Sequence, residues 1–251
     1  MTKIIGIASG KGGVGKTTTV VNLAAALTEM GYRVCIVDGN VTTSNLGLHL
    51  GVTDYPSTIH DVLKGRIKMI DAVFVHPSEI HVVTGSLTLA DARGVNVKSF
   101  KKELKLLSKY YEFIIVDTSP TLENNAVKII EGCDNLLIVT TPELPAITDA
   151  IKIIEHAKEK EINILGIIIN RYKGKPYEIT PEEIYNLYRI PVVAIIPEEE
   201  EIQKSIAMRI PVVLLNPKIK ASVEFYEIAR QISGVKERKP PPLFKLPTKK
   251  K

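Results

Sequence analysis

The sequence contains 251 residues, of which 45% are hydrophobic and 24% charged, a balance typical of a globular protein. No apolar run approaches the ~20 residues that cross a membrane, and the first apolar stretch is too short for a signal peptide. We therefore expect neither a membrane-spanning nor a secreted protein, but a cytoplasmic one. The two cysteines, Cys35 and Cys133, form no CxxC pair and are expected in the core.

The formal net charge of +5 is concentrated at one end of the chain. Residues 234–251 carry six lysines and one arginine against one glutamate, which leaves the remainder close to neutral. This distribution argues against nucleic-acid binding by the main body. Abundant Lys, Glu and Ile with only two glutamines hints at a thermophilic source.

Apolar, β-branched runs alternate with stretches of helical periodicity along the chain. Strands are predicted at 4–8, 34–37, 80–83, 113–116, 136–139, 164–169 and 192–196, and helices at 17–30, 58–64, 98–109, 123–131, 146–160, 181–188, 199–208 and 218–233. Continuously apolar strands are typical of a sheet covered on both faces. The order predicts an α/β fold: a doubly wound, mainly parallel β-sheet with helices on both faces, formed by residues 1–233 as one domain.

The first predicted strand runs into a glycine-rich loop and then into a helix, which is the context of a phosphate-binding P-loop. Its glycines let successive backbone N–H groups turn toward an anion, and the helix N-terminus adds partial positive charge. Lys16 can reach the β- and γ-phosphates, and the Thr17 hydroxyl can bind Mg²⁺. The alternative is a glycine-rich turn that binds nothing. The loop residues are Gly10, Lys11, Gly12, Gly13, Val14, Gly15, Lys16, Thr17 and Thr18.

Polar residues also follow other predicted strands, whose carboxyl ends should meet at the P-loop edge of the sheet. Asp117 follows four apolar residues and is expected to hold hydrated Mg²⁺; the alternative is a helix N-cap or turn aspartate. Asn170, followed by Arg171, offers a donor and an acceptor that suit an adenine edge, although asparagine is also a common turn former.

The loop 10–18 contains a second lysine, Lys11, and in this it resembles the deviant Walker A motif of the MinD/ParA/Mrp family of ATPases. The resemblance continues to about residue 232 and is closest to archaeal MinD-like proteins. Residues 37–46 resemble the family's first switch, 115–120 its Walker B motif and second switch, 170–172 its adenine-reading strand end, and 196–213 a later nucleotide-contacting loop that includes Pro197 and Glu198.

This resemblance implies a P-loop ATPase that binds ATP, ADP and Mg²⁺ and forms a homodimer around two ATP molecules. Lys11 would reach the partner's phosphates, and Asp38 would lie beside the γ-phosphate. Thr17 and Asp117 would hold Mg²⁺. Asn40 stands where the family usually has aspartate, and a neutral amide is a poorer proton acceptor, so we expect slow hydrolysis. A second departure is the segment 118–121, which lacks the glycine usual after Walker B.

The predicted function is therefore an ATP-dependent molecular switch that controls a partner protein, such as a metallochaperone or a cell-division or localisation factor. Two alternatives remain open: an accessory ATPase for metalloenzyme maturation, for example nickel delivery to hydrogenase, and an ATP-binding scaffold without turnover. No Cys/His cluster has zinc or iron–sulfur spacing, which argues against an iron–sulfur carrier.

The segment 234–251 is predicted to be a flexible, basic, proline-rich tail. Its four prolines forbid a regular helix. Leu243, Phe244 and Leu246 among the lysines could contact an anionic membrane surface or a partner groove, or the tail could remain solvated.

Overall fold

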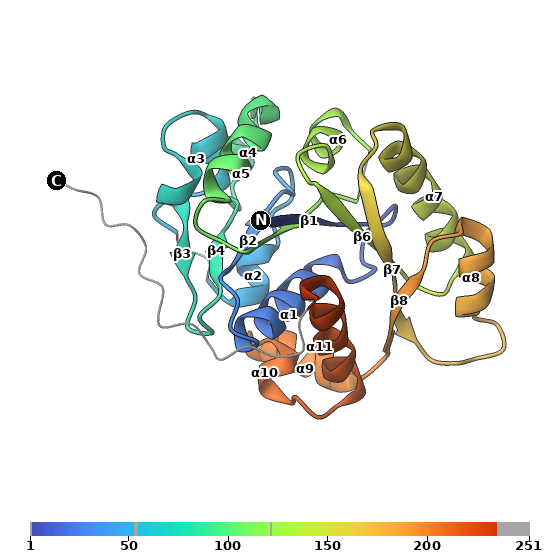
Figure 1. Ribbon diagram of the computed structural model, residues 1–251. Coiled ribbons are helices and arrows are strands. Elements are labelled where there is room, and N and C mark those ends of the chain that lie inside the picture. Colours follow the sequence, from blue (N-terminus) through green and yellow to red (C-terminus); the bar gives the residue numbers. More distant parts are fainter. Residues whose placement is uncertain (1, 53–54, 121, 235–251) are drawn as a thin grey trace.

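The protein forms one eight-stranded sheet in the order β3-β4-β2-β5-β1-β6-β7-β8 (Figure 1). This computed structural model describes residues 2–52, 55–120 and 122–234, so most of the predicted tail lies outside the described residues. The strands are β1 (Lys3–Ala8), β2 (Val34–Asp38), β3 (Phe74–Val75), β4 (His81–Val83), β5 (Phe113–Asp117), β6 (Asn135–Thr140), β7 (Asn163–Tyr172) and β8 (Val192–Pro197). Only the β3–β4 pairing is antiparallel among these described strands.

Helices cover both faces of the sheet (Figure 1). One face carries α1 (Lys16–Glu29), α2 (Leu46–Leu50), α9 (Glu200–Met208), α10 (Val212–Leu215) and α11 (Lys220–Ser233). The other carries α3 (Ile59–Leu63), α4 (Leu89–Ala92), α5 (Phe100–Leu107), α6 (Asn124–Ile130), α7 (Leu144–Glu159) and α8 (Pro181–Tyr188), with short 3₁₀ turns at Met69–Ala72 and Val97–Ser99. The predicted doubly wound α/β architecture is therefore confirmed.

Two hydrophobic cores lie on opposite faces of the sheet, and the strands contribute to both by alternation. In β1, Ile4 and Ala8 belong to the core that includes Phe100 of α5, whereas Ile5 and Ile7 belong to the core under α1 and α11. This arrangement explains why the strands read as continuous apolar runs. It also buries β1 at the centre of the sheet, between β5 and β6, where the loop that follows it is firmly anchored.

All seven predicted strands are present, with ends that differ by a few residues. The two-residue strand β3 was not predicted, because it is too short to show alternation. The helices α2, α4 and α10, of four or five residues, were also missed, since they span hardly more than one turn. No helix in the described part of the chain has the length and apolarity to cross a membrane.

The edge strand β8 is protected by side chains of α11. The backbone N–H of Ile195 donates to Glu224 Oε2 at 3.4 Å, and Gln231 Nε2 donates to the carbonyl of Val193 at 3.3 Å. Unpaired edge groups are a template for adding another strand. The last helix therefore both completes a core and blocks one edge of the sheet.

The packing of α11 predicts that Phe225→Ala strongly destabilises the protein, because the Phe225 ring is fully buried in the core beneath α1. We expect the free energy of unfolding to fall by about 3–5 kcal/mol in urea denaturation. Val223→Ala on the exposed side of the same helix is the matched control, and it should change that free energy by less than about 0.5 kcal/mol. Equal losses in the two variants would contradict the assigned packing.

Candidate functional site

The loop between β1 and α1 has a backbone that only glycine adopts easily. Gly13 has φ 77°, and Gly15, the N-cap residue of α1, has φ 100° and ψ 25°. Gly15 supplies no capping side chain, so the first N–H groups of α1 are available to an anion. Strand, loop and helix thus have the backbone geometry that a phosphate-binding loop requires.

Two glycines of this loop lie against neighbouring elements. A Cβ at Gly10 would be 2.0 Å from the carbonyl oxygen of Asp149 in α7, and one at Gly15 would be 2.1 Å from Asn170 Nδ2. Asn170, at the end of β7, donates this Nδ2 to the carbonyl of Val14 at 2.7 Å. Asn170, which was predicted to bind adenine, therefore also hydrogen-bonds the loop to the end of β7.

Lys16 is buried at the base of the loop. Its Nζ donates to Ser9 Oγ at 2.8 Å, and the Ser9 hydroxyl in turn donates to the carbonyl of Lys11 at 2.8 Å. Burial lowers the pKa of the Lys16 ammonium, while the Asp117 carboxylate opposes this shift. The Lys11 side chain, in contrast, is exposed.

Two carboxyl groups meet at the carboxyl ends of adjacent strands, because Asp38 of β2 is in register with Asp117 of β5. Thr17 Oγ1 donates to Asp117 Oδ2 at 2.6 Å, whereas Asp117 Oδ1 is buried with no hydrogen-bond partner among the described residues. Burial raises the pKa of both carboxyls, and Asp117 raises that of Asp38 further. A buried, unsatisfied carboxylate oxygen beside a threonine hydroxyl is a donor set that fits Mg²⁺.

The segment after β2 folds around Asp38. The backbone N–H of Asn40 donates to Asp38 Oδ1 at 3.0 Å, and the Ser44 hydroxyl and the Leu46 N–H donate to Oδ2. The Asn40 amide is itself engaged, since Nδ2 donates to Thr43 Oγ1 at 3.0 Å and Oδ1 accepts from the Thr43 N–H at 3.3 Å. Asn40 is therefore held by its own loop at the rim of the site.

A cavity of about 370 Å³ lies over these groups. A smaller pocket of about 50 Å³ adjoins it, and Gly15, Thr18 and Arg171 line both. The predicted site residues that line one or both are Gly12, Gly13, Gly15, Lys16, Thr17, Thr18, Asn40, Asp117, Asn170, Arg171, Pro197 and Glu198. Gly10, Lys11, Val14 and Asp38 do not line them: Gly10 abuts α7, Val14 lies in a core, and Asp38 is buried behind the rim.

The lining residues that were not among the predicted site residues are Thr43, Asn45, Leu48, His49, Thr118, Pro120, Glu199, Ile202, Gln203 and Ile206. All of them except Leu48 and His49 fall within segments singled out in the sequence, namely 37–46, 115–120 and 196–213. Leu48 and His49 belong to the unpredicted helix α2, and only its tertiary position brings them to the cavity.

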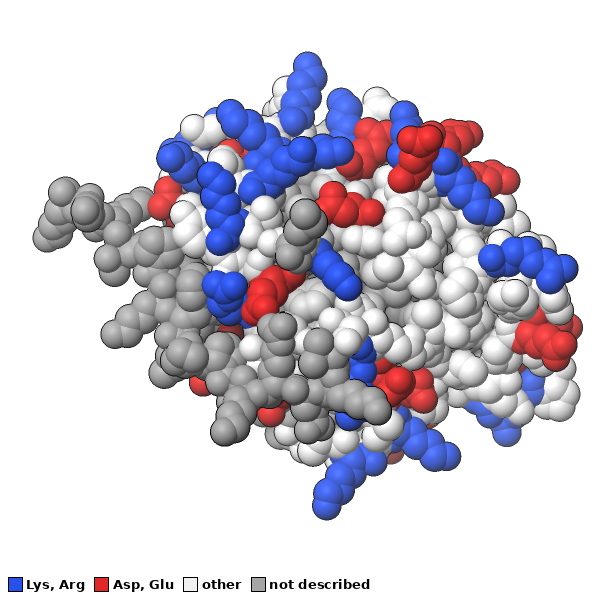
Figure 2. Space-filling view, viewed as in Figure 1, with Lys and Arg blue, Asp and Glu red and all other residues white. Residues whose placement is uncertain are grey.

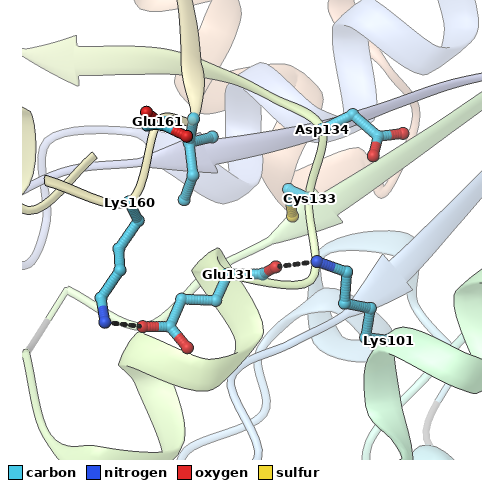
Figure 3. Close-up of a pocket in the computed structure, with 7 residues that line it drawn as sticks. Lys101, Glu131, Cys133, Asp134, Lys160 and Glu161 are labelled. Carbon is cyan, nitrogen blue, oxygen red and sulfur yellow. Dashed lines mark hydrogen bonds and ion pairs between the residues drawn. The ribbon is translucent and has the colours of Figure 1, made fainter. Parts of the chain in front are cut away.

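A further pocket, of about 380 Å³, lies at the opposite end of the strands, where β6 and β7 begin (Figure 3). Lys101 Nζ donates to the carbonyl of Glu131 at 3.2 Å, and Lys160 Nζ lies 3.4 Å from Glu131 Oε1. Cys133 borders the pocket, and burial raises the pKa of its thiol. This pocket has no phosphate-binding loop and its two lysines are already paired.

Comparisons with known proteins agree with this geometry. Residues 1–233 match the ParA family, described as a NUBPL iron-transfer P-loop NTPase. An uncharacterised ATP-binding protein of Methanocaldococcus jannaschii is 33% identical over 232 residues, which are 92% of this chain and 88% of that protein. MinD of Pyrococcus horikoshii complexed with Mg-ADP has a TM-score of 0.88 and 35% identity, covering 92% of this chain and 96% of that one. The MinC:MinD complex of Aquifex aeolicus gives a TM-score of 0.84 at 26% identity, covering 96% and 99%.

The geometry of the loop predicts unequal effects for two glycine substitutions. Gly15→Ala places a methyl group against Asn170 at a positive φ, so we expect it to cost about 1–3 kcal/mol of unfolding free energy and to weaken binding of a fluorescent ATP analogue. Gly65→Ala is the matched control, because Gly65 also has a positive φ (72°) but does not line the cavity, and a Cβ there would meet no atom within 4 Å. Equal affinity of the two variants for the analogue would refute the assigned role of Gly15.

Proposed function

Because the chain belongs to the ParA family of P-loop NTPases, we propose that it is an ATP-dependent molecular switch. ATP closes a homodimer, slow hydrolysis reopens it, and each state presents a different surface to a partner protein. The observation that carries this proposal is the convergence of the P-loop, the Thr17–Asp117 pair and the Asp38–Asn40 segment on one cavity.

The chain's own groups divide the work of binding ATP. The loop N–H groups and Lys16 would bind the phosphates, and Thr17 and Asp117 are the residues that would hold Mg²⁺. Bound Mg²⁺ would neutralise the charge that develops on the phosphate oxygens. The adjoining pocket, with Asn170, Arg171, Pro197 and Glu198 in its lining, receives the base.

Dimer formation is supported by the groups around the cavity. Lys11 is exposed on the loop and is available to the phosphates bound by a second copy. Leu48 and Ile206 line the cavity yet remain exposed, at 47% and 36% respectively, and Met208, two residues farther along α9, is also exposed. A second copy facing this rim would cover apolar surface and bring Lys11 to the transferred phosphate, where its charge stabilises the transition state.

Asn40 favours slow turnover, and its amide supports a second candidate, an ATP-binding scaffold without hydrolysis. Both polar atoms of the amide bind Thr43, and an amide is a poor proton acceptor. The scaffold would bind ATP through the same loop and hold the closed dimer. Turnover is the measurement that separates the two candidates.

A role in metalloenzyme maturation, such as iron transfer or nickel delivery, would leave the metal on a partner. Both cysteines are buried, and burial raises the pKa of each thiol, including Cys133 at the pocket in Figure 3. Among the residues that the structure describes, no group of three or more His, Cys, Asp or Glu could hold a metal ion. A metallochaperone or a cell-division factor is the partner class that this switch would serve.

A protein partner is favoured over nucleic acid by the charge of the body. The face shown in Figure 2 carries acidic side chains among its lysines and arginines, and the strongly basic segment of the sequence is confined to residues 234–251. Phosphate backbones bind continuous basic surfaces.

Asn40→Asp should raise ATP turnover by at least about tenfold, because a carboxylate accepts a proton far better than an amide. The carboxylate would keep the bond from the Thr43 N–H, so the loop is expected to retain its fold. Asn186→Asp adds the same charge at an exposed position of α8 that does not line the cavity, and it should leave turnover near the wild-type rate. Phosphate release under saturating Mg-ATP measures both. If Asn40→Asp leaves the turnover rate unchanged, Asn40 is not the cause of slow hydrolysis.

Sedimentation-velocity experiments with ATP and with ADP test the homodimer. They use the wild-type protein, whose Asn40 is expected to keep hydrolysis slow during the measurement. We expect a dimer in ATP and a monomer in ADP. Lys11→Ala should remain monomeric in both, whereas Lys102→Ala, an exposed lysine of α5, should behave as the wild type. A monomer in saturating ATP would refute the sandwich dimer, and a Lys11→Ala dimer would remove Lys11 from its interface.

A further inference from the structure

His60 of α3 joins two segments that are distant in sequence. The residue is only 1% exposed. Its Nε2 lies 2.8 Å from the carbonyl oxygen of Val41, and the backbone N–H of Ser86 donates to its Nδ1 at 3.0 Å. Since Nδ1 accepts, the neutral ring carries its proton on Nε2 and donates it to Val41. One tautomer thus satisfies both contacts.

The first of these segments surrounds the site. Val41 directly follows Asn40, and Ser44 farther along the same loop donates to the Asp38 carboxylate. Ser44 also lies against Gly85, where a Cβ would be 2.7 Å from Ser44 Oγ and 3.3 Å from His60 Cε1. The loop 40–44 and the segment after β4 are therefore in direct contact, with the His60 ring beside them.

The second segment leads to the surface. The Ser86 and Thr88 hydroxyls each donate to Asp91 Oδ2 at 2.8 Å, and Lys64 Nζ donates to Asp91 Oδ1 at 3.1 Å. Leu87, between the two hydroxyl residues, is 48% exposed. Residues 86–91 thus form a hydrogen-bonded surface unit, which we call the 86–91 segment, and the N–H that begins it is held by His60.

We propose that His60 is a positioning residue that couples the 40–44 loop to the 86–91 segment, so that a nucleotide-dependent movement of the loop reaches the surface. This inference rests on the proposed function. The imidazole ring is rigid and bonded at opposite sides, so a shift of the Val41 carbonyl either moves the ring or leaves a buried polar group unpaired, which is costly. Coupling of this kind is reciprocal: a partner that binds the 86–91 segment would alter ATP affinity.

Three substitutions at His60 separate its two contacts. Gln places an N–H near the position of Nε2 and keeps the bond to Val41, whereas Asn places an acceptor near Nδ1 and keeps the bond from Ser86. Leu removes both. His81→Leu is the matched control, because His81 is another buried histidine of this half of the sheet whose ring bonds Tyr111 Oη at 2.8 Å, away from the 40–44 loop.

The experiment measures ATP turnover, ADP affinity and hydrogen–deuterium exchange with ADP and with a non-hydrolysable ATP analogue. His60→Leu and His60→Asn should lower turnover by about tenfold, the effect of one lost hydrogen bond, and His60→Gln should restore most of it. ADP affinity should stay within about twofold, because the contacts of ADP lie on the P-loop. Exchange in residues 84–91 should differ between the two nucleotides in the wild type and in His81→Leu, but not in His60→Leu or His60→Gln.

The possible failures are distinct. If the wild type shows no nucleotide-dependent exchange in residues 40–46, the proposed switch itself fails. If residues 40–46 respond but residues 84–91 do not, or if the response of 84–91 survives in His60→Gln, the switch stands and the role of His60 is overturned. Should His60→Leu fail to fold, the Gln and Asn variants decide the outcome by the same two readouts.

Discussion

The placement of Asp38 and Asp117 side by side is the constraint around which the site is built. Parallel pairing of β2 with β5 puts both carboxyls at one level, buried at the end of the sheet. Two such groups repel and lose hydration, so their neighbours must supply donors. Thr17 from the helix after the P-loop serves Asp117, and the segment 40–46 wraps around Asp38. The P-loop and the segment 40–46 are thus both organised by this pair.

The same arrangement explains how nucleotide binding can affect residues outside the cavity. Asp38 holds its loop through three donors, and that loop is in turn fixed by His60 and by close packing on Gly85. A cation or phosphate that changes the charge near Asp38 therefore acts on a segment with several defined contacts. A loop with few contacts could move without displacing its neighbours, whereas a loop with several hydrogen bonds transmits its movement to the residues that it contacts.

Most of the predicted site residues line the cavity or the pocket beside it, because the signals that identify them are local in the sequence. The P-loop glycines, Lys16 and Thr17 are contiguous, and Asp117 ends an unmistakable apolar strand, so strand order alone brings it to Thr17. The contact between Gly10 and Asp149 and the bond from Asn170 to Val14 could not be foreseen, since they join residues far apart in the chain. His60 was one of five scattered histidines, and nothing near it in sequence indicates a link to Val41 and Ser86. The roles of Asn170, Pro197 and Glu198 toward the base remain predictions.

The position of α11 also has a consequence for biosynthesis. This helix is the last described element, yet it packs on α1, which directly follows the P-loop, and it shields the outer groups of β8. While the ribosome is still making the chain, β8 emerges before its shield, and α1 lacks part of its support. The nascent protein therefore passes through a stage with an open sheet edge and an unfinished nucleotide site. Chaperone capture would be most useful at that stage, and a ribosome stalled before α11 would display a chain prone to strand addition.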